Sequence, residues 1–533
     1  MDLSTFQLEF MVAKTPLMLL KNFIPVLIPL ILSIIFLCKW LNHTENPTKN
    51  LPPSPPRIPI VGNLHQVARL SIPQRGLRAL AQIYGPVMRL RLGRREAIVI
   101  SSAEVAEQIL RTNDLIFADR IQPSFVGRLL YDFKDIGFSR YGEYWRQMRL
   151  VTVSRLLTTK MVQSFRSLRE EEIINMLGSI RESCFSGSTV RINEILARFS
   201  NNIISSAAIG KRYSELKNGN RFQELFSECT MICGYSNIAD FIPWLGWLNH
   251  INGMESKVNR VAKEVDEYLE SIVEQGVEKM MSSSSINGGD CKEDKRPQNF
   301  LDVLLGLQQE NALAFTLDIN SIKALILDII LGGTESTYTL LEWAFAELLR
   351  NPTSMTKLKD EVRQLSRCKS KSVDMITEED LGSLPYLKAV IKEALRMHPP
   401  APFLVRQSRK AVKILGYDIA PGTFVYINGW AIGRDIESWE RPDEFRPERF
   451  LNNSPVDLKG HHFQFLPFGS GRRICPGSAF ALVIAELALA NLILNFNFEL
   501  ADGKKPEELD MTEAHGLVTI KKTPLLVVAS LPN

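Results

Sequence analysis

A single cysteine near the C-terminal end of the chain lies in a loop whose composition suits a reactive thiol. The loop Pro467–Gly477 reads PFGSGRRICPG, so Cys475 closely follows two adjacent arginines and is surrounded by glycines and prolines. A thiolate is the form of cysteine that attacks substrates or binds metals, and nearby positive charge stabilises it. A buried, inert cysteine in a turn is the alternative. The loop makes Cys475 the first candidate for chemistry.

A second candidate region combines an acid with hydroxyl groups inside an apolar segment. The stretch IKALILDIILGGTESTYTLLEWAFAELL has the length and composition of a buried helix, yet Gly332 and Gly333 interrupt it. Each glycine costs up to about 1 kcal/mol relative to alanine in a helix interior. Glu335, Ser336 and Thr337 follow almost directly, and an acid beside a hydroxyl can transfer protons. A kink with satisfied polar groups is the alternative, but it does not explain an acid in so apolar a run.

The elements that must position these residues are mainly helical. Apolar residues at spacings of three and four predict helices in the segments 165–180, 254–281, 353–365 and 480–496. Short strands are predicted within 86–102 and 413–432. No internal repeat or break divides the chain. The pattern favours one mainly α domain with small β-sheets.

Composition excludes several classes of protein. The 533 residues are 45% hydrophobic and 23% charged, which is typical of an ordered globular protein. A net charge of +4, from 63 Lys and Arg against 59 Asp and Glu, is too small to indicate a nucleic-acid partner. The seven cysteines form no CxxC pair, so neither a disulfide framework nor a zinc site is indicated. This usage favours folding in a reducing compartment.

The first 50 residues contain an apolar run that predicts a membrane anchor. From Phe23 to Cys38 the chain has about 16 uncharged residues. This is slightly short of the roughly 20 that span hydrocarbon, unless Lys21 extends toward the interface and Trp40 lies there. A cleaved signal peptide is the alternative, but no small-residue cleavage site follows. Basic residues after the run favour a cytosolic location for the rest of the chain.

Residues 51–62 follow as a proline-rich hinge, LPPSPPRIPIVG. Proline fixes φ and removes a hydrogen-bond donor, so the segment is predicted to be a stiff, extended strut that orients the body on the membrane. An ordinary flexible linker is the alternative. The predicted organisation is therefore an anchor with its flank at 1–50, the hinge, and a body at 63–533.

The cysteine loop resembles the signature of the cytochrome P-450 superfamily, the haem-thiolate monooxygenases. The pattern F-x-x-G-x-R-x-C-x-G is carried by Phe468, Gly471, Arg473, Cys475 and Gly477. The resemblance implies that Cys475 ligates the haem iron, that Arg473 pairs with a haem propionate, and that the other positions shape the loop around the cofactor. Glycines let backbone N–H groups approach the sulfur, and the helix that follows directs its positive end toward it.

Other segments match the same family. Glu393 and Arg396 of KEALR, completed by Arg449 of FRPERF, would form a buried structural network behind the haem. Trp145 and Arg149 of YGEYWRQMR match a W-x-x-x-R pattern that would reach a haem propionate.

Two further matches depart from the usual pattern. Arg406 falls where the family places another propionate-binding arginine, but Val405 precedes it where proline is usual. In GGTEST, Glu335 is the family's acid and Ser336 stands where threonine is usual, with Thr337 as a second hydroxyl. Serine keeps the hydroxyl but lacks the methyl group that stiffens χ1.

The order of the motifs is that of the plant microsomal monooxygenases of specialised metabolism. It implies the cytochrome P-450 fold, with haem b (iron protoporphyrin IX) buried between a long distal helix and the proximal cysteine loop in a catalytic domain at 63–533. A single-pass anchor would hold that domain on the cytosolic side of the endoplasmic reticulum membrane. The implied reaction inserts one oxygen atom of O2 into a small hydrophobic terpenoid, phenylpropanoid, coumarin or alkaloid.

Electrons must come from a partner, because the chain has no Rossmann or flavin motif. The resemblance implies NADPH-cytochrome P-450 reductase, with cytochrome b5 as a further donor. Arg146 and Arg472 are candidates to meet an acidic partner surface, or are simply solvated. Two rival functions are a non-oxygenating haem-thiolate enzyme, such as a dehydratase or isomerase, and a haem or sterol binding protein without turnover. Glu335 and Ser336 argue against both.

The substrate pocket is expected to be mostly apolar. By analogy with the family its lining is Phe125, Val126, Leu130, Ile326, Ile330, Thr334, Ala401, Phe403, Leu517 and Val518. His515 stands where phenylalanine is frequent, and it either contacts a polar substrate group or serves only in packing.

Overall fold

The computed structural model describes residues 27–36, 49–215, 219–285, 298–310, 315–368, 375–451 and 454–532. The longer helices are α3 (Pro73–Tyr84), α6 (Glu143–Val151), α8 (Arg166–Ser186), α9 (Ile192–Ile209), α10 (Gly219–Gly234), α13 (Met254–Ser285), α14 (Phe300–Gln309), α15 (Ile319–Arg350), α16 (Pro352–Cys368), α17 (Pro385–Met397) and α19 (Ser478–Asn495). Shorter helices are α2 (Leu64–Val67), α4 (Ala103–Glu107), α5 (Ser124–Leu129), α7 (Thr159–Ser164), α11 (Ile238–Phe241), α12 (Leu248–Ile251) and α18 (Gly429–Ile432).

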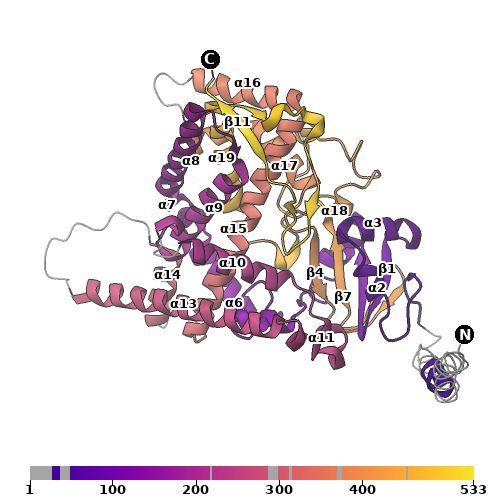
Figure 1. Ribbon diagram of the computed structural model, residues 1–533. Helices are drawn as coiled ribbons and strands as arrows, with labels where there is room; N and C mark the ends of the chain where they lie inside the picture. The colour runs from indigo at the N-terminus through magenta and orange to yellow at the C-terminus, as the bar shows by residue number, and fades with distance from the viewer. Residues whose placement is uncertain are drawn as a thin grey trace, which may run out of the picture.

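The strands form small sheets. Their bounds are β1 (Val87–Leu92), β2 (Arg95–Ile100), β3 (Val190–Arg191), β4 (Phe403–Gln407), β5 (Val412–Ile414), β6 (Tyr417–Ile419), β7 (Phe424–Asn428), β8 (Asn497–Leu500), β9 (Glu513–Ala514), β10 (Ile520–Lys521) and β11 (Leu526–Ser530). The largest sheet has the order β1-β2-β7-β4, in which only β2 and β7 run parallel. It lies beside α3, whereas α8, α9 and α13 lie on the other side of α15 (Figure 1). The prediction of a mainly α domain with small β-sheets is confirmed.

Helix α15 passes through the middle of the molecule and carries the GGTEST segment without a break. Its N-terminus is capped by Asp318, whose carboxylate accepts the Ser321 N–H at 2.7 Å. Helix α9 crosses it so closely that a Cβ on Gly333 would lie 3.1 Å from Ile204 Cδ1. Close packing against α9 therefore favours a residue without a side chain at Gly333, one of the two glycines of the segment.

Helix α19 begins directly after the cysteine loop, and most of its side chains are buried. It and α15 are long and apolar enough to cross a membrane, yet 61% and 56% of their most apolar windows are buried within the protein. They are therefore core helices, which bring the two candidate regions of the sequence together.

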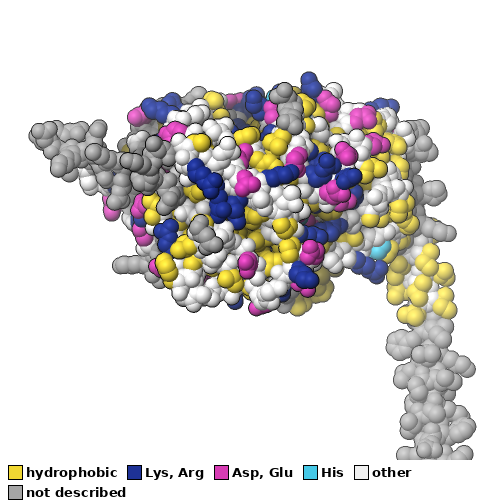
Figure 2. Space-filling model, turned by 90° about the horizontal axis from the view of Figure 1, so that it is seen from above, with side chains coloured by type: hydrophobic (Ala, Val, Ile, Leu, Met, Phe, Trp, Pro, Cys, Tyr) yellow, Lys and Arg dark blue, Asp and Glu magenta, His cyan; other side chains and the backbone are white. Residues whose placement is uncertain are grey.

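The N-terminal part of the chain is described only in part. A helix at Leu27–Phe36 exposes its apolar side chains, while the remainder of the predicted run Phe23–Cys38 lies outside the described residues. In the hinge, residues 51–57 form no helix, and Pro52 and Pro55 are buried against the body. On the face shown in Figure 2, Lys and Arg side chains alternate with Asp and Glu.

Candidate functional site

The cysteine loop holds its thiol by backbone contacts. The Cys475 N–H donates to the Phe468 carbonyl at 2.9 Å, which closes the loop. Gly471 has a φ of +68°, and a Cβ there would lie 2.5 Å from the Leu110 carbonyl oxygen. The turn therefore requires glycine at that position. The Cys475 side chain is accessible although protein surrounds it, which is expected of a thiol that faces internal space.

Opposing effects act on this thiol. Burial raises the pKa of Cys475, whereas hydrogen bonds from the Gly477 and Ser478 backbone N–H groups and the charge of Arg149 lower it. The two amides belong to the first turn of α19, where the helix dipole also favours an anion. The loop thus supplies groups that favour a thiolate, but burial outweighs them and the pKa of Cys475 is raised overall.

Helix α6 packs Trp145 and Arg149 against this loop. Arg149 Nη2 donates to the Ile474 carbonyl at 2.6 Å, one residue before the cysteine. The indole N–H of Trp145 donates to the Ile136 carbonyl at 3.0 Å, and the Trp145 ring lies 4.1 Å from the Arg473 guanidinium carbon. Trp145 therefore supports Arg473 in this structure, and its single N–H is already used.

Arg473 is buried, and each of its guanidinium nitrogens has a carbonyl partner. It donates to Ala118 at 2.9 Å, to Ile136 at 3.1 Å and to Ser139 at 2.6 Å. These contacts tie the cysteine loop to the segment that precedes α6.

Two other arginines, in contrast, retain unsatisfied donors. Arg406 is 1% exposed, and its Nε and Nη2 have no hydrogen-bond partner within the described residues. It lies in the regular strand β4, so Val405 in place of proline leaves the local backbone ordered. Arg120 also has an Nε that finds no partner in the part of the chain that the structure describes. Sequence analysis missed Arg120, because no motif distinguishes it from other arginines.

These guanidinium groups lack sufficient countercharge. Burial, together with the charges of Arg120 and Arg473, holds the pKa of Arg406 well below its usual range. Burial likewise lowers the pKa of Arg120 to about 10 and that of Arg473 to about 9. Buried cations with free donors call for an anion. The residues present therefore fit the two carboxylates of a haem group.

The other wall of the site is one face of α15. Asp328, Gly332 and Ser336 follow one another at intervals of four residues and so share one face of α15, and all three are at least partly accessible, as are Gly333, Thr334 and Glu335. A Cβ added to Gly332 would contact nothing within 4 Å. Asp328 is also close enough to the cysteine to raise the pKa of the Cys475 thiol. The Asp328 end of this face therefore lies near the cysteine loop.

The acid and the hydroxyl groups of GGTEST point in different directions. Ser336 Oγ donates to the Gly332 carbonyl at 2.7 Å on the accessible face, whereas Thr337 is buried and bonds the Gly333 carbonyl. Glu335 lies beside Thr230 of α10, and burial raises its pKa to about 7. An acid that titrates near neutrality can both accept and donate protons.

A pair of aspartates joins α15 to the loop before α6, which sequence analysis did not foresee. Asp328 Oδ2 accepts the backbone N–H groups of Ile136 and Gly137 at 3.2 and 3.1 Å. Asp135 is fully buried nearby, and burial together with the charge of Asp328 raises its pKa. The Ile136 carbonyl also accepts a hydrogen bond from Arg473 of the cysteine loop. Asp328 therefore fixes the loop at Ile136, and that loop in turn fixes the cysteine loop.

The predicted structural network is present and buried. Glu393 accepts two bonds from Arg396, at 2.7 and 2.8 Å, and one from Arg449 Nε at 2.9 Å. Arg396 also donates to the carbonyls of Gly433 and Pro442. The network ties α17 to the PERF turn, as the resemblance implies.

The remaining candidates differ in their surroundings. Phe125, Val126, Leu130, Ile326 and Ile330 pack together in the main core. His515 is accessible, yet burial of its ring lowers its pKa.

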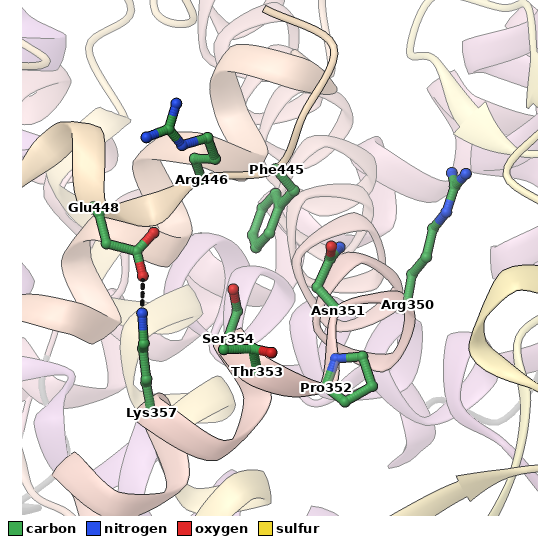
Figure 3. A pocket seen from close by; sticks show the side chains of 9 residues that line it. All are labelled: Arg350, Asn351, Pro352, Thr353, Ser354, Lys357, Phe445, Arg446 and Glu448. Atoms are coloured by element: carbon green, nitrogen blue, oxygen red, sulfur yellow. Dashed lines mark hydrogen bonds and ion pairs between the residues drawn. The ribbon is translucent and has the colours of Figure 1, made fainter. Parts of the chain in front are cut away.

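The basic candidates for partner contact already have partners within the chain. Arg146 pairs with Glu143, and Arg472 pairs with Asp114 at 2.8 Å. A surface hollow of about 430 Å³ between α15, α16 and the PERF turn (Figure 3) includes none of the predicted site residues.

Comparison with known proteins agrees with the geometry. The cytochrome P450 family model matches residues 52–528. The chain is 45% identical over 512 residues to tabersonine/lochnericine 19-hydroxylase of Catharanthus roseus, covering 96% of this chain and 98% of that protein. It is 43% identical to norfluorocurarine oxidase of Strychnos sp and 44% identical to psoralen synthase of Ammi majus, each covering 94% of this chain and 96% of the relative.

The family implies a haem cofactor, a redox partner and a small-molecule substrate. The donor set around Cys475 and Arg406 is consistent with that cofactor. The chain therefore belongs to the cytochrome P450 family, and it is a monooxygenase of that family.

Proposed function

We propose that the protein is a membrane-bound haem-thiolate monooxygenase that inserts one oxygen atom of O2 into a small hydrophobic plant metabolite. The observation that supports this proposal is that Asp328, which shares a face of α15 with Gly332 and Ser336, lies close enough to affect a cysteine thiol held by two backbone amides. Relatives named as a hydroxylase, an oxidase and psoralen synthase support the reaction class.

Cys475 is the proposed ligand of the haem iron. A thiolate ligand pushes electron density to the iron, and haem held in this way supplies the chemistry that cleaves the O–O bond. The N–H groups of Gly477 and Ser478 and the charge of Arg149 favour the anionic sulfur and oppose the effect of burial, which on its own raises the pKa of Cys475. Phe468 fixes the loop through its carbonyl group.

The haem carboxylates are proposed to meet Arg406 and Arg120, whose free donors are otherwise unsatisfied. Arg149, Arg473 and Trp145 complete this side of the site. Trp145 acts by fixing the loop around Ile136, since its one N–H already has a carbonyl partner. Arg473 fixes the same loop through three carbonyls, and its remaining N–H donors are proposed to meet a haem carboxylate.

Glu335 and Ser336 are proposed to deliver protons to the oxygen chemistry. The Ser336 hydroxyl lies on the accessible face and can exchange the Gly332 carbonyl for a water molecule. Glu335, whose pKa burial raises to about 7, is a suitable proton source. Thr337 is buried behind Ser336 and has a supporting role only.

The substrate is proposed to be an alkaloid, a coumarin or other phenylpropanoid, or a terpenoid, since relatives carry the names of tabersonine, norfluorocurarine and psoralen. Electrons are proposed to come from NADPH through cytochrome P450 reductase, with cytochrome b5 as a second donor. Residues 1–50 would anchor the chain in the endoplasmic reticulum membrane, 51–62 would orient it, and 63–533 would form the cytosolic catalytic domain.

The test is reconstitution of the full chain with plant reductase, NADPH and ¹⁸O2. A panel of alkaloids, coumarins and terpenoids is first screened for binding by the shift of the haem absorption spectrum. The proposal predicts that a binding compound acquires one ¹⁸O atom in an NADPH-dependent reaction. Conversion of a bound compound without label would contradict it and indicate a non-oxygenating enzyme, whereas binding without any conversion would indicate a carrier.

A further inference from the structure

A second group of arginines lies away from the cysteine loop, around a small cavity. The cavity has a volume of about 240 Å³ and lies between α3, the C-terminal ends of α15 and α17, and the segment after α18. Four arginines line it: Arg75, Arg78, Arg350 and Arg434. Among the described residues two carboxylates, Glu347 and Asp443, also line it, which gives the lining a net charge of +2 with His398 neutral. Arg75 is paired with Glu513 at 3.1 Å beside the cavity, so the uncompensated charge belongs to the other arginines.

Arg434 is the central residue of this cavity. It is 4% exposed, it stacks 4.0 Å from the centre of the Trp430 ring, and its Nη1 has no hydrogen-bond partner within the described residues. Burial lowers its pKa to about 9, although the charges of Glu513 and Asp443 oppose this effect. A buried guanidinium with a free donor requires an acceptor in the cavity that it lines.

The nearby carboxylates do not supply that acceptor. Glu513 already accepts from Arg75 at 3.1 Å and from Trp430 at 3.2 Å. Glu347 is used by His398 at 2.7 Å and by Asn351 at 3.1 Å. Asp443 is 70% exposed and stays 3.5 Å from Arg434 Nε and 3.9 Å from Arg78 Nη1, beyond good hydrogen-bond distance. The positive charge of the cavity is therefore only partly compensated by the protein itself.

Arg350 adds a donor that can reach an incoming anion. It is exposed, and it lines both this cavity and the hollow of Figure 3. Figure 3 shows its side chain pointing away from Lys357 and Glu448, which pair with each other. Arg350 is thus not held by the carboxylate of that neighbouring hollow.

We propose that this cavity binds a small phosphate-type oxyanion, either free phosphate or the phosphate monoester of a lipid headgroup, through Arg434, Arg350 and Arg78. Guanidinium groups from different elements can each donate to a different oxygen of a tetrahedral anion. The volume is below the roughly 300 to 1,000 Å³ of cavities that hold drug-sized ligands, so a small anion is the suitable occupant.

The test uses the purified haem-loaded full chain and isothermal titration with inorganic phosphate, against chloride at equal ionic strength. Saturable binding of phosphate is expected. Arg350→Gln removes a surface donor without disturbing the core, and it should weaken binding about tenfold, the effect of losing one charge-assisted hydrogen bond. Asp443→Asn removes a competing negative charge, so it should strengthen binding.

The matched control is Arg446→Gln, which changes an arginine of the hollow in Figure 3 that does not line this cavity. Phosphate binding should be unchanged in this variant. Absence of saturable binding to the wild-type chain, or equal binding by wild type, Arg350→Gln and Asp443→Asn, would overturn the proposal. Both substitutions are at exposed side chains, so the test does not depend on whether an Arg434 variant folds.

A second titration with short-chain phosphatidic acid distinguishes the two sources. Binding at least about tenfold tighter than phosphate, and sensitive to Arg350→Gln, would assign the site to a lipid headgroup. Equal affinity would assign it to free phosphate. Neither titration measures oxygenation, so failure here leaves the monooxygenase proposal unaffected.

Discussion

Arg120 and Arg406 donate to the same acceptor, the carbonyl oxygen of Val405, and both keep guanidinium nitrogens without a partner among the described residues. Two buried cations that share one carbonyl are unfavourable unless an anion joins them. The proposed anion is the pair of haem carboxylates. The two unpaired arginines therefore destabilise the haem-free protein, and their ion pairs with the carboxylates stabilise the haem-bound protein.

Arg406→Met separates the effect of this arginine on the stability of the haem-free protein from its effect on haem binding. The haem-free variant should be as stable as wild type or more so, since an unpaired buried charge is replaced by an apolar side chain of similar length. Haem should transfer to an acceptor apoprotein about tenfold faster, because a charge-assisted hydrogen bond is lost. Arg409→Met, a change at a partly exposed arginine of the same segment, is the control. Unchanged haem transfer in Arg406→Met would remove Arg406 from the cofactor site.

The raised pKa of Glu335 predicts a pH dependence of stability. Its folded-state pKa, about 7, lies above the ordinary value of 4.5. Between about pH 4.5 and about pH 7 the folded state binds more protons than the unfolded state. The contribution of Glu335 to the free energy of unfolding is therefore fully present below about pH 4.5. That contribution is lost as the pH rises through about 7. In Glu335→Gln the free energy of unfolding should therefore fall less between about pH 5 and pH 8 than in wild type. Equal slopes in denaturant titrations of the two proteins would show that Glu335 is not desolvated.

Ser336 and Thr337 offer a matched pair for the proton-delivery proposal. Ser336→Ala should still bind haem and substrate, but a larger share of NADPH electrons should appear as hydrogen peroxide, severalfold more per product than in wild type. Ser336→Thr should keep or improve coupling, because it restores the stiffer side chain, unless the site is too tight for one more methyl.

Thr337→Ala is the control for that experiment, since its hydroxyl is buried and bonded to the Gly333 carbonyl. The ratio of peroxide to product should stay near the wild-type value. If Thr337→Ala uncouples and Ser336→Ala does not, the roles of the two hydroxyls are reversed.

Deletion of residues 1–50 tests the proposed organisation. The truncated chain keeps the whole haem-binding region, so its haem content should equal that of the full chain, while its sedimentation with membranes should fall. Residual peripheral binding is compatible with the proposal. Truncated protein that is soluble but lacks haem would show that the N-terminal region contributes to the fold of the body.

The sequence predicted the elements of this fold more fully than the contacts inside the site. The spacing of apolar residues at intervals of three and four predicted α8, α13, α16 and α19, because each of these helices buries apolar side chains against the core. The loop motif located Cys475, since its glycines and arginines lie within a few residues of one another.

Contacts between distant segments were harder to foresee. Arg120 and the pairing of Asp328 with the loop at Ile136 depend on segments about 190 to 290 residues apart. Trp145 donates its one N–H to the Ile136 carbonyl, and Arg473 donates to the carbonyls of Ala118, Ile136 and Ser139. That these two residues also reach a propionate stays a prediction. Backbone acceptors of this kind leave no trace in side-chain spacing. Likewise, one glycine of GGTEST is explained by the crossing of α9, which the helix's own sequence does not encode.

The most direct test of the central claim is the absorption spectrum of the reduced, carbon monoxide-bound protein with and without the Cys475 thiol. Wild type should show the red-shifted Soret band of thiolate-ligated haem, and so should Cys368→Ala, which changes an exposed cysteine outside the loop. Cys475→Ala should lose that band, and Cys475→His should replace it with the band of an imidazole-ligated haem. Retention of the thiolate band in Cys475→Ala would contradict the account.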